Sequence, residues 1–272
     1  MANEIITGSQ MSAYLNNNSV MKYLESVLKE RSGSFVASMA SIVSSDKRLQ
    51  ECTASSLMMC GLKAASMNLP IDPNLGYAYP VPYNSKNLPD GVKEAQFQMG
   101  YKGYIQLAMR TGQYKKIVVT DIKAGEVKSI DPITETYEFV PIFDETTRDK
   151  LPIAGYYAKF ELTNGFVKEI YWAIEKIMIH AKRYSKSFSR SDSQWQQNSD
   201  SMARKTVLRQ LLSKWGPMSV EMQKAHEADM AVIKVDEDTL TESIEYPDND
   251  STDEETSEQS PLAGETDAVN EG

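Results

Sequence analysis

The segment most informative about the fold is residues 96–120, QFQMGYKGYIQLAMRTGQYKKIVVT. Its apolar spacing changes from that of a strand to that of a helix and back again. Residues 96–101, rich in Phe and Tyr, predict a strand, while residues 103–111 have the apolar spacing of a short helix. Gly112 follows at the position where a glycine commonly ends a helix, and residues 117–122 predict a second strand. The segment therefore predicts a strand–turn–helix–strand unit, which is typical of an α+β fold.

The chain on the N-terminal side of this unit has mostly helical patterns. Residues 1–18 are polar, with three consecutive asparagines, and predict a flexible N-terminal arm. Ser19 is predicted to cap a first helix, and amphipathic patterns predict two more, over residues 32–44 and after Thr53. Two prolines end the last of these helices, and a strand over residues 76–83 then leads through a turn-rich stretch into the unit above.

Strands and then helices follow toward the C-terminus. An Asn-Gly pair at residues 164–165, between two apolar runs, predicts a β-hairpin. The predicted strands are residues 135–140, 155–162 and 166–172, and the predicted helices are residues 174–184, 199–214 and 220–233. Since these strands do not alternate with helices, we expect a central antiparallel sheet.

The formal net charge of −9 conceals a basic body and an acidic tail. Residues 235–272 hold 14 of the 38 acidic residues and none of the 29 basic residues, so residues 1–234 carry a net charge of +5. A segment with this composition cannot bury a core, and we expect residues 235–272 to form a disordered acidic tail. Residues 19–234 are expected to form one folded domain.

Several kinds of catalytic site have no counterpart in the sequence. It contains no G-x-x-x-x-G-K-[ST] phosphate loop, no H-E-x-x-H zinc motif and no G-x-S-x-G nucleophile elbow. His180 and His226 are far apart and have no cysteine cluster near them, which argues against a zinc site. We therefore predict a protein that is not an enzyme, with no catalytic residue, no metal and no cofactor.

One acidic stretch keeps a Mg²⁺-dependent nuclease as an alternative function. Its members are Asp121, Glu126, Asp131 and Glu135. A nuclease needs carboxylates that converge on the metal, and the spacing of these four matches no recognisable metal motif. The exposed rim of a hairpin explains them more simply.

The opening segment is also the first of two that suggest nucleic acid. Residues 96–120 contain four basic residues, no acidic residue and interleaved aromatic residues; the basic ones are Lys102, Arg110, Lys115 and Lys116. Cations can neutralise phosphates, and aromatic faces such as that of Tyr101 can stack on unpaired bases. On composition alone, buried tyrosines and solvated lysines explain this segment better.

Two glycines add a backbone argument to the same segment. Gly100 and Gly103 flank Tyr101 and Lys102 at the predicted strand-to-helix junction. Small residues there let a backbone approach closely, and the amides of a helix N-terminus favour an anion.

The second basic segment spans residues 176–214. It holds nine basic residues against two acidic ones: Lys176, Lys182, Arg183, Lys186, Arg190, Arg204, Lys205, Arg209 and Lys214 against Asp192 and Asp200. Residues 184–199, rich in Ser, Arg and Gln, predict a mobile basic loop that contains Trp195. Lys205 and Arg209 are four residues apart and share one helix face, where a polyanion would relieve their repulsion. A solvated helix face is the alternative, but the charge imbalance favours a functional surface.

Taken together, these residues resemble the RecT family of phage single-strand annealing recombination proteins. The most specific matches are QMGYKGYIQLAMRTGQY at residues 98–114 and MARKTVLRQLL at residues 202–212, which follows Trp195. The turn LPIDPNLGYAY at residues 69–79 precedes them in the expected order. The likeness covers about residues 20–230, the whole predicted domain.

The resemblance implies a function that the residue pattern alone did not establish. Members bind single-stranded DNA and anneal complementary strands into duplex without ATP. They assemble as homo-oligomers, in rings or helical filaments, and a phage exonuclease usually supplies the single strands. Their core is similar to the β-β-β-α core of the eukaryotic annealing proteins, so residues 19–234 would be the annealing domain.

The resemblance also transfers DNA contact to individual residues of the matched motifs. They are Lys102, Arg110, Lys205 and Arg209, with Tyr101 as a candidate base contact. Charge alone extends the prediction to Arg204, Lys115, Lys116, Lys182, Arg183 and Arg190. We expect the two basic segments to meet in one cationic channel, although Arg204 and Lys205 cannot both be centred on one helix face.

The tail and the termini complete the expectations. The acidic tail either competes with DNA or engages partners such as a host single-strand-binding protein, or it only keeps the protein in solution, and the last interpretation is slightly favoured. Residues 1–10 have no signal-peptide pattern, and no apolar run is long enough to span a membrane. We expect a cytoplasmic protein of a bacterial host cell, with free thiols at Cys52 and Cys60 and no membrane partner. A phage structural or scaffolding protein is the remaining alternative.

Overall fold

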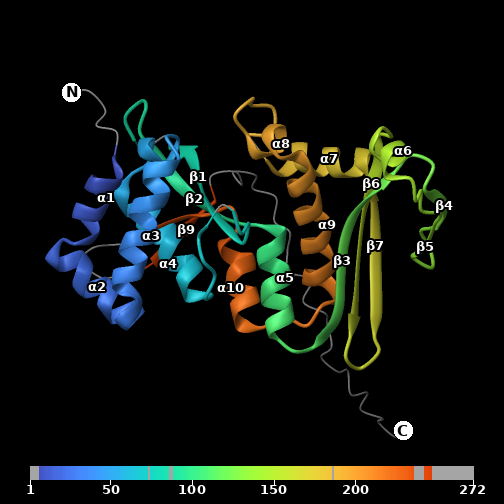
Figure 1. The fold of residues 1–272 in the computed structure, drawn as a ribbon, viewed down its shortest axis with the longest axis horizontal. Helices are drawn as coiled ribbons and strands as arrows, with labels where there is room; N and C mark the ends of the chain where they lie inside the picture. The colour runs from blue at the N-terminus through green and yellow to red at the C-terminus, as the bar shows by residue number, and fades with distance from the viewer. Residues whose placement is uncertain (1–5, 73, 86–87, 186, 236–241, 247–272) are drawn as a thin grey trace, which may run out of the picture.

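The computed structural model of the chain describes residues 6–72, 74–85, 88–185, 187–235 and 242–246 (Figure 1). The helices are α1 Gly8–Leu15, α2 Asn18–Leu28, α3 Ser32–Ser45, α4 Ala54–Ser66, α5 Tyr101–Arg110, α6 Glu145–Asp149, α7 Ile174–Tyr184, α8 Gln194–Gln197, α9 Ser199–Trp215 and α10 Val220–Ala228, with 3₁₀ turns η1 Lys29–Arg31 and η2 Leu49–Glu51. The strands are β1 Ala78–Asn84, β2 Lys93–Met99, β3 Tyr114–Lys123, β4 Val127–Asp131, β5 Thr136–Phe139, β6 Ile153–Leu162, β7 Val167–Ala173, β8 Val232–Val235 and β9 Glu242–Glu245. Helices and antiparallel strands are mixed, which confirms the predicted α+β class.

The helix α9 joins two regions of the molecule (Figure 1). On one side lie α1–α4, the β1–β2 hairpin, α5 and α10, and on the other lies the sheet of β3, β6 and β7. α9 contacts α5 on the first side and all three strands of the sheet on the second. Side chains on opposite faces of α9 therefore have very different surroundings.

The expected antiparallel sheet is divided into several smaller ones. In the largest, β6 lies between β3 and β7, and all three strands are antiparallel. The turn between β6 and β7 contains Gly165, whose positive φ of 87° is readily available only to glycine, so the Asn-Gly hairpin forms as predicted. The other described strands pair as the two-stranded sheets β1–β2, β4–β5 and β8–β9.

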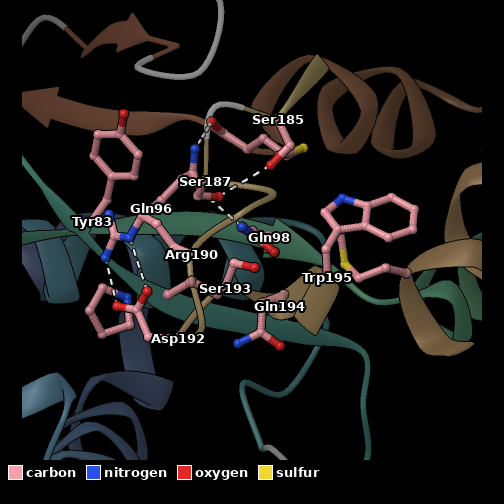
Figure 2. Close-up of a pocket in the computed structure, with 14 residues that line it drawn as sticks. Tyr83, Gln96, Gln98, Ser185, Ser187, Arg190, Asp192, Ser193, Gln194 and Trp195 are labelled. Atoms are coloured by element: carbon pink, nitrogen blue, oxygen red, sulfur yellow. Dashed lines mark hydrogen bonds and ion pairs between the residues drawn. The ribbon is translucent and has the colours of Figure 1, made fainter. Parts of the chain in front are cut away.

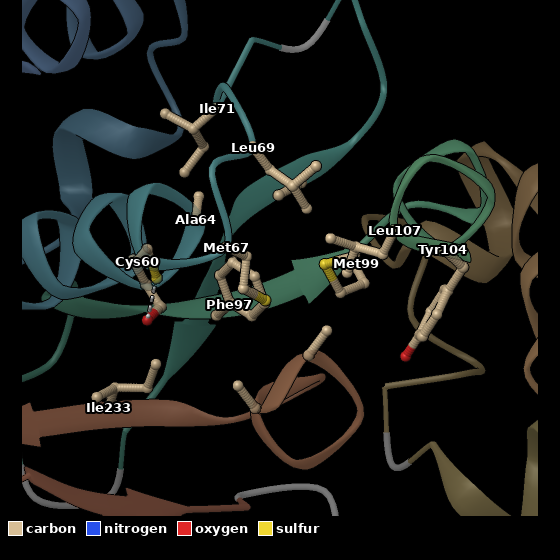
Figure 3. Packing of buried hydrophobic residues seen from close by; sticks show 14 of the residues in the cluster. Cys60, Ala64, Met67, Leu69, Ile71, Phe97, Met99, Tyr104, Leu107 and Ile233 are labelled. Atoms are coloured by element: carbon tan, nitrogen blue, oxygen red, sulfur yellow. Dashed lines mark hydrogen bonds between the residues drawn. The ribbon is translucent and has the colours of Figure 1, made fainter. Parts of the chain in front are cut away.

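The N-terminal region is built around the buried face of α4 and the strand β2 (Figure 3). Thr53 caps α4 by accepting a hydrogen bond from the Ser56 amide, which starts the helix where the sequence predicts. Cys60, on the buried face, donates from Sγ to the Ala95 carbonyl at 3.3 Å. Cys52 and Cys60 are free, as expected, and both are buried; burial raises the pKa of the Cys52 thiol to about 12.

The two glycines at the start of α5 serve the packing of the protein itself. A Cβ atom at Gly100 would lie 2.1 Å from the Gly76 carbonyl oxygen, and one at Gly103 would lie 2.2 Å from that of Tyr77. The backbone that approaches closely is therefore the turn before β1. Close packing against the protein's own backbone is therefore enough to explain these two glycines, without a phosphate bound at the start of α5.

Two boundaries differ from the sequence predictions. The predicted arm contains α1, which a capping box of Thr7 and Gln10 starts and which buries Met11 and Leu15, so the arm prediction is wrong for residues 8–15. The polar composition of this short helix conceals two apolar positions one turn apart.

The last predicted helix is shorter than expected, and two strands follow it. α10 ends at Ala228, and Ala231 then forms an antiparallel bridge with Phe97 before β8 begins. β9 pairs with β8 inside the segment for which disorder was predicted, so that prediction does not hold for residues 242–245. Residues 236–241 and 247–272 of the predicted tail lie outside the described residues. None of the helices that the structure describes is long and apolar enough to cross a membrane.

Candidate nucleic-acid interface

A groove of about 640 Å³ runs between α7 and α9, with residues from the end of α10 at its floor. Four basic side chains line it: Lys176, Lys205, Arg209 and Lys214. Both histidines of the chain also line it, together with aromatic residues from β7 and α7. Asp229 is the one carboxylate among the described lining residues. The groove is therefore basic and partly aromatic.

α7 forms one wall because its two faces differ. Ile177 and Ala181 are buried and hold the helix against the rest of the protein. Lys176, His180 and Tyr184 repeat every four residues, so they share the face that lines the groove. Neither Lys176 nor His180 was predicted as a site residue. Their four-residue spacing on one helix face is the signal in the sequence that could have identified them.

The cations of α7 keep their charge available. Lys182 and Arg183 are exposed on the same helix, and the described residues include no carboxylate within ion-pair distance of Lys176, Lys182 or Arg183. Lys176 Nζ instead lies 4.4 Å from the ring centroid of Trp172, and the Arg183 guanidinium lies 5.3 Å from that of Tyr184. A cation over an aromatic face is stabilised without being neutralised.

Lys205, at the floor of the groove, has a buried ionic partner. Its Nζ donates to Asp229 Oδ1 at 2.7 Å, and the two side chains are 6% and 0% exposed. Asp229 also accepts from the Met99 amide at 2.9 Å and from the Tyr104 hydroxyl at 3.1 Å. Its carboxylate therefore joins β2, α5 and α9, and Lys205 supplies the charge that makes its burial tolerable.

Arg209, like the exposed Lys214 near the end of α9, faces the open groove. Its Nε donates to His226 Nδ1 at 3.2 Å and lies 3.9 Å from Asp229 Oδ2, and about a third of its side chain is exposed. Burial, and then the nearby Arg209 charge, lower the pKa of His226, so the ring is neutral and can accept this hydrogen bond. Lys205 and Arg209 do share one helix face, as predicted, but only Arg209 is accessible.

Arg204 lies on the opposite face of α9, against the β3–β6–β7 sheet. It forms ion pairs of 2.7 Å with Asp121 and 2.8 Å with Asp200, and it donates to the Val119 carbonyl at 3.1 Å. Although burial opposes it, hydrogen bonding to Arg204 lowers the pKa of Asp121. Arg204 thus fastens α9 to the sheet, which is neither the predicted DNA contact nor a solvated helix face.

The predicted residues of the first basic segment do not line the groove. Arg110 donates to the carbonyls of Met67 and Asn68, both at 3.0 Å, and so closes the C-terminal end of α4. Lys102 is exposed beside the turn at Gly76, and Tyr101 is half-buried against the core. The expected single channel from both segments is therefore not assembled within one subunit.

The remaining predicted cations are spread over other surfaces. Lys116 is exposed at the start of β3, and its neighbour Lys115 pairs with Glu161 at 2.5 Å. Arg190 pairs with Asp192 at 2.6 Å beside a second pocket (Figure 2). That pocket holds about 30 Å³, which suits a water molecule and not a nucleotide.

The predicted mobile basic loop has local structure over its described residues. Ser193 caps α8, and Trp195 is 6% exposed and packs against Phe188 with ring centroids 6.1 Å apart. Trp195 is thus a packing anchor more than a base platform. Lys186, the other basic residue in this stretch, lies outside the described residues.

The four carboxylates considered for a nuclease each have a structural role. Glu126 is buried, where an exposed hairpin rim was expected, and it accepts from Arg148 Nε at 2.7 Å and from the Lys123 amide at 2.7 Å. Despite burial, these bonds hold its pKa at about 2. Asp131 caps its own turn, Glu135 pairs with Lys168, and Asp121 binds the Arg204 described above. In the part of the chain that the structure describes, no three His, Cys, Asp or Glu side chains converge on a metal site.

Comparison with known proteins identifies what the chain is similar to. The pattern that describes the RecT family matches residues 33–247. An uncharacterized protein of Bacillus subtilis (strain 168), YqaK, is 43% identical over 261 residues, which cover 96% of this chain and 86% of that protein. Protein RecT of Escherichia coli (strain K12) is 27% identical over 206 residues, which cover 74% of each chain.

Proposed function

Since the chain belongs to the RecT family, we propose that it binds single-stranded DNA in the groove between α7 and α9 and anneals complementary strands without ATP. The proposal extends to phage homologous recombination, in which annealing proteins act. The observation that carries it is the set of cations along α7, of which Lys176 lines the groove while Lys182 and Arg183 are exposed on the same helix outside its lining. These charges are available to phosphates, whereas most other predicted cations already have partners.

The physical requirements of annealing fit such a groove. Two complementary strands repel each other through their phosphates, and a row of cations lowers that repulsion and releases counterions. Sequence specificity then comes from base pairing between the strands, so the protein needs no base-reading contacts. Stacking in the new duplex releases about 1–2 kcal/mol per step, which makes ATP hydrolysis unnecessary.

Assembly into an oligomer is part of the proposal. Neighbouring subunits in a ring or helical filament would extend the groove of one subunit and make binding cooperative. DNA contacts by Lys102, Lys115 and Lys116 remain predictions, because these exposed side chains lie on α5 and β3 and not on the helices that form the groove. A phage exonuclease and a host single-strand-binding protein are the proposed protein partners.

An annealing assay tests the proposed function directly. Two complementary oligonucleotides, one labelled, are mixed with the protein in the absence of ATP, and duplex formation is compared with the spontaneous rate. We expect the wild-type protein to accelerate annealing and the triple variant Lys176→Gln, Lys182→Gln, Arg183→Gln to lose most of that acceleration. Negative-stain images of the product would report rings or filaments.

A matched control separates the groove from total charge. Lys22→Gln, Lys47→Gln, Lys150→Gln removes three charges from exposed positions outside the groove, and this variant should anneal like wild type. Equal losses in both triple variants would mean that the cations of α7 have no special role. Shortening of a labelled strand with Mg²⁺ would indicate a nuclease, and absence of DNA binding at moderate salt would favour the scaffolding alternative.

A further inference from the structure

Three aromatic rings form a continuous row on one wall of the groove. The ring centroids of Trp172 and His180 are 5.4 Å apart, and those of His180 and Tyr184 are 4.5 Å apart. All three side chains line the groove. Trp172 comes from the end of β7 and the other two from successive turns of α7, so the sheet and the helix together build the row.

Cations stand at both ends of this row. Lys176 lies over the Trp172 ring and Arg183 over the Tyr184 ring, at 4.4 and 5.3 Å from the centroids. Each cation is therefore held next to a ring of the row. An alternation of aromatic faces and positive charges is the arrangement that single-stranded nucleic acid favours.

Packing alone explains this row poorly. Tyr184 is 36% exposed, and Trp172 and His180 are half-buried at the groove surface. Trp195, by contrast, is 6% exposed although it lines the same groove. The row therefore presents aromatic surface to the space that the proposed strand would occupy.

We propose that Trp172, His180 and Tyr184 form a stacking platform for unpaired nucleobases of the bound strand. The inference rests on the proposed function and assigns a ligand chemistry to one wall of the same groove. In a duplex both faces of each base are covered by its neighbours, so such a platform selects single strands. Pairing with a second strand would withdraw the bases from the rings, and the annealed product would then bind more weakly at this wall.

The test compares two polymers that differ only in their bases. Oligothymidylate and an abasic oligonucleotide of equal length carry the same phosphates, and only the first can stack. In the variant Trp195→Phe, Trp215→Phe, Trp172 is the remaining tryptophan of the chain and reports on the platform. We expect oligothymidylate to quench its fluorescence and the abasic polymer to bind without quenching.

Affinity measurements on Tyr184 give the second readout. Tyr184→Ala should weaken oligothymidylate binding by about tenfold and abasic binding by less than about twofold, since stacking is lost and phosphate contacts remain. Tyr184→Phe keeps the ring and should behave like wild type. Trp215→Phe is a matched aromatic control, because Trp215 is 48% exposed and lies outside the groove lining.

The outcomes separate this inference from the proposed function. If wild type binds both polymers equally well and neither polymer quenches Trp172 in the Trp195→Phe, Trp215→Phe variant, the platform is refuted while the cationic groove stands. The same conclusion follows if Tyr184→Ala weakens both polymers equally. If wild type binds neither polymer, the proposed function itself fails, and the platform fails with it.

Discussion

α7 and α9 are both basic helices on the same groove, but the first two cations of α9 are bound to carboxylates, whereas those of α7 are not bound to any carboxylate that the structure describes. On α9, Arg204 and Lys205 are paired with carboxylates of other elements, whereas Arg209, which lies 3.9 Å from Asp229, and the exposed Lys214 face the groove. On α7, Lys176 and Arg183 lie over aromatic rings and keep their charge. The count of lysines and arginines in a helix therefore does not measure its capacity to bind a polyanion. What matters is whether the partner of each cation is a carboxylate or a ring.

The largest effect is expected at Lys205. Because its charge is paired with Asp229, replacing Lys205 should lower the stability of the protein and should not remove a DNA contact. Lys205→Met leaves the Asp229 carboxylate buried without its cation, which should lower the free energy of unfolding by about 3–5 kcal/mol. Urea denaturation followed by circular dichroism measures this. The double variant Lys205→Met, Asp229→Asn should recover part of the loss. A variant that stays fully stable but no longer binds DNA would reverse the roles assigned to the two helices.

The next effect concerns the charges of α7, which should affect binding and leave folding unchanged. The triple variant Lys176→Gln, Lys182→Gln, Arg183→Gln should lower affinity for oligothymidylate about 100-fold near 0.1 M salt. The slope of log affinity against log salt should fall by about 2, as expected for three lost phosphate contacts. Fluorescence anisotropy across a salt series checks both values. An unchanged slope would show that these cations do not touch phosphates.

A third, smaller effect should appear in the paired region when carboxylates are protonated. The pKa of Glu126 is about 2 in the folded protein, below its ordinary value of 4.5, so its bond to Arg148 stabilises the fold above pH 4.5 and is lost as the pH falls toward 2. Between these pH values wild type should lose about 2 kcal/mol more stability than Glu126→Gln. Parallel stability curves for the two proteins would contradict this assignment.

The smallest effect is expected from His226, which lies between the paired and the open cations. Burial and the nearby Arg209 charge lower the pKa of His226 in the folded protein. On acidification the imidazole is therefore protonated in the unfolded chain first, near pH 6.5, and below that pH His226 lowers the stability of the fold. A bound phosphate favours the protonated ring, and DNA affinity should therefore rise a few-fold between about pH 7 and 5.5. His226→Gln should reduce this rise. Identical pH profiles of wild type and variant would place the ring away from the DNA.

Periodicity predicts the elements of this fold well where one face is apolar over several turns. Residues 174–184 form α7 with the predicted bounds, and the Asn-Gly turn places β6 and β7 as expected. α1 was missed because it buries only Met11 and Leu15 within a polar sequence. Residues 232–233 were predicted to end a helix because their apolar side chains also fit a helical spacing, and the Ala231–Phe97 bridge just before β8 joins positions more than a hundred residues apart.

The sequence predicts that basic residues gather at the site, but it does not predict which groups pair with them. Helical spacing correctly places Lys205 and Arg209 on one face. Asp229 looks like an ordinary polar position in the sequence, and only the packing of α5, β2 and α9 shows that it neutralises Lys205. The ring row was missed for a similar reason, since Trp172 precedes α7 in the chain and joins it only through the turn of the backbone after β7.

The carboxylate of Asp229 also has a consequence for the order in which the chain can fold during its synthesis. It accepts the Met99 amide from 130 residues earlier in the sequence, and the Tyr104 hydroxyl from 125 residues earlier. The nascent N-terminal half therefore emerges from the ribosome with two polar groups whose acceptor has not yet been translated. Truncated polypeptides that stop before residue 229 should accordingly be open to proteases and should depend on chaperones until the missing segment arrives.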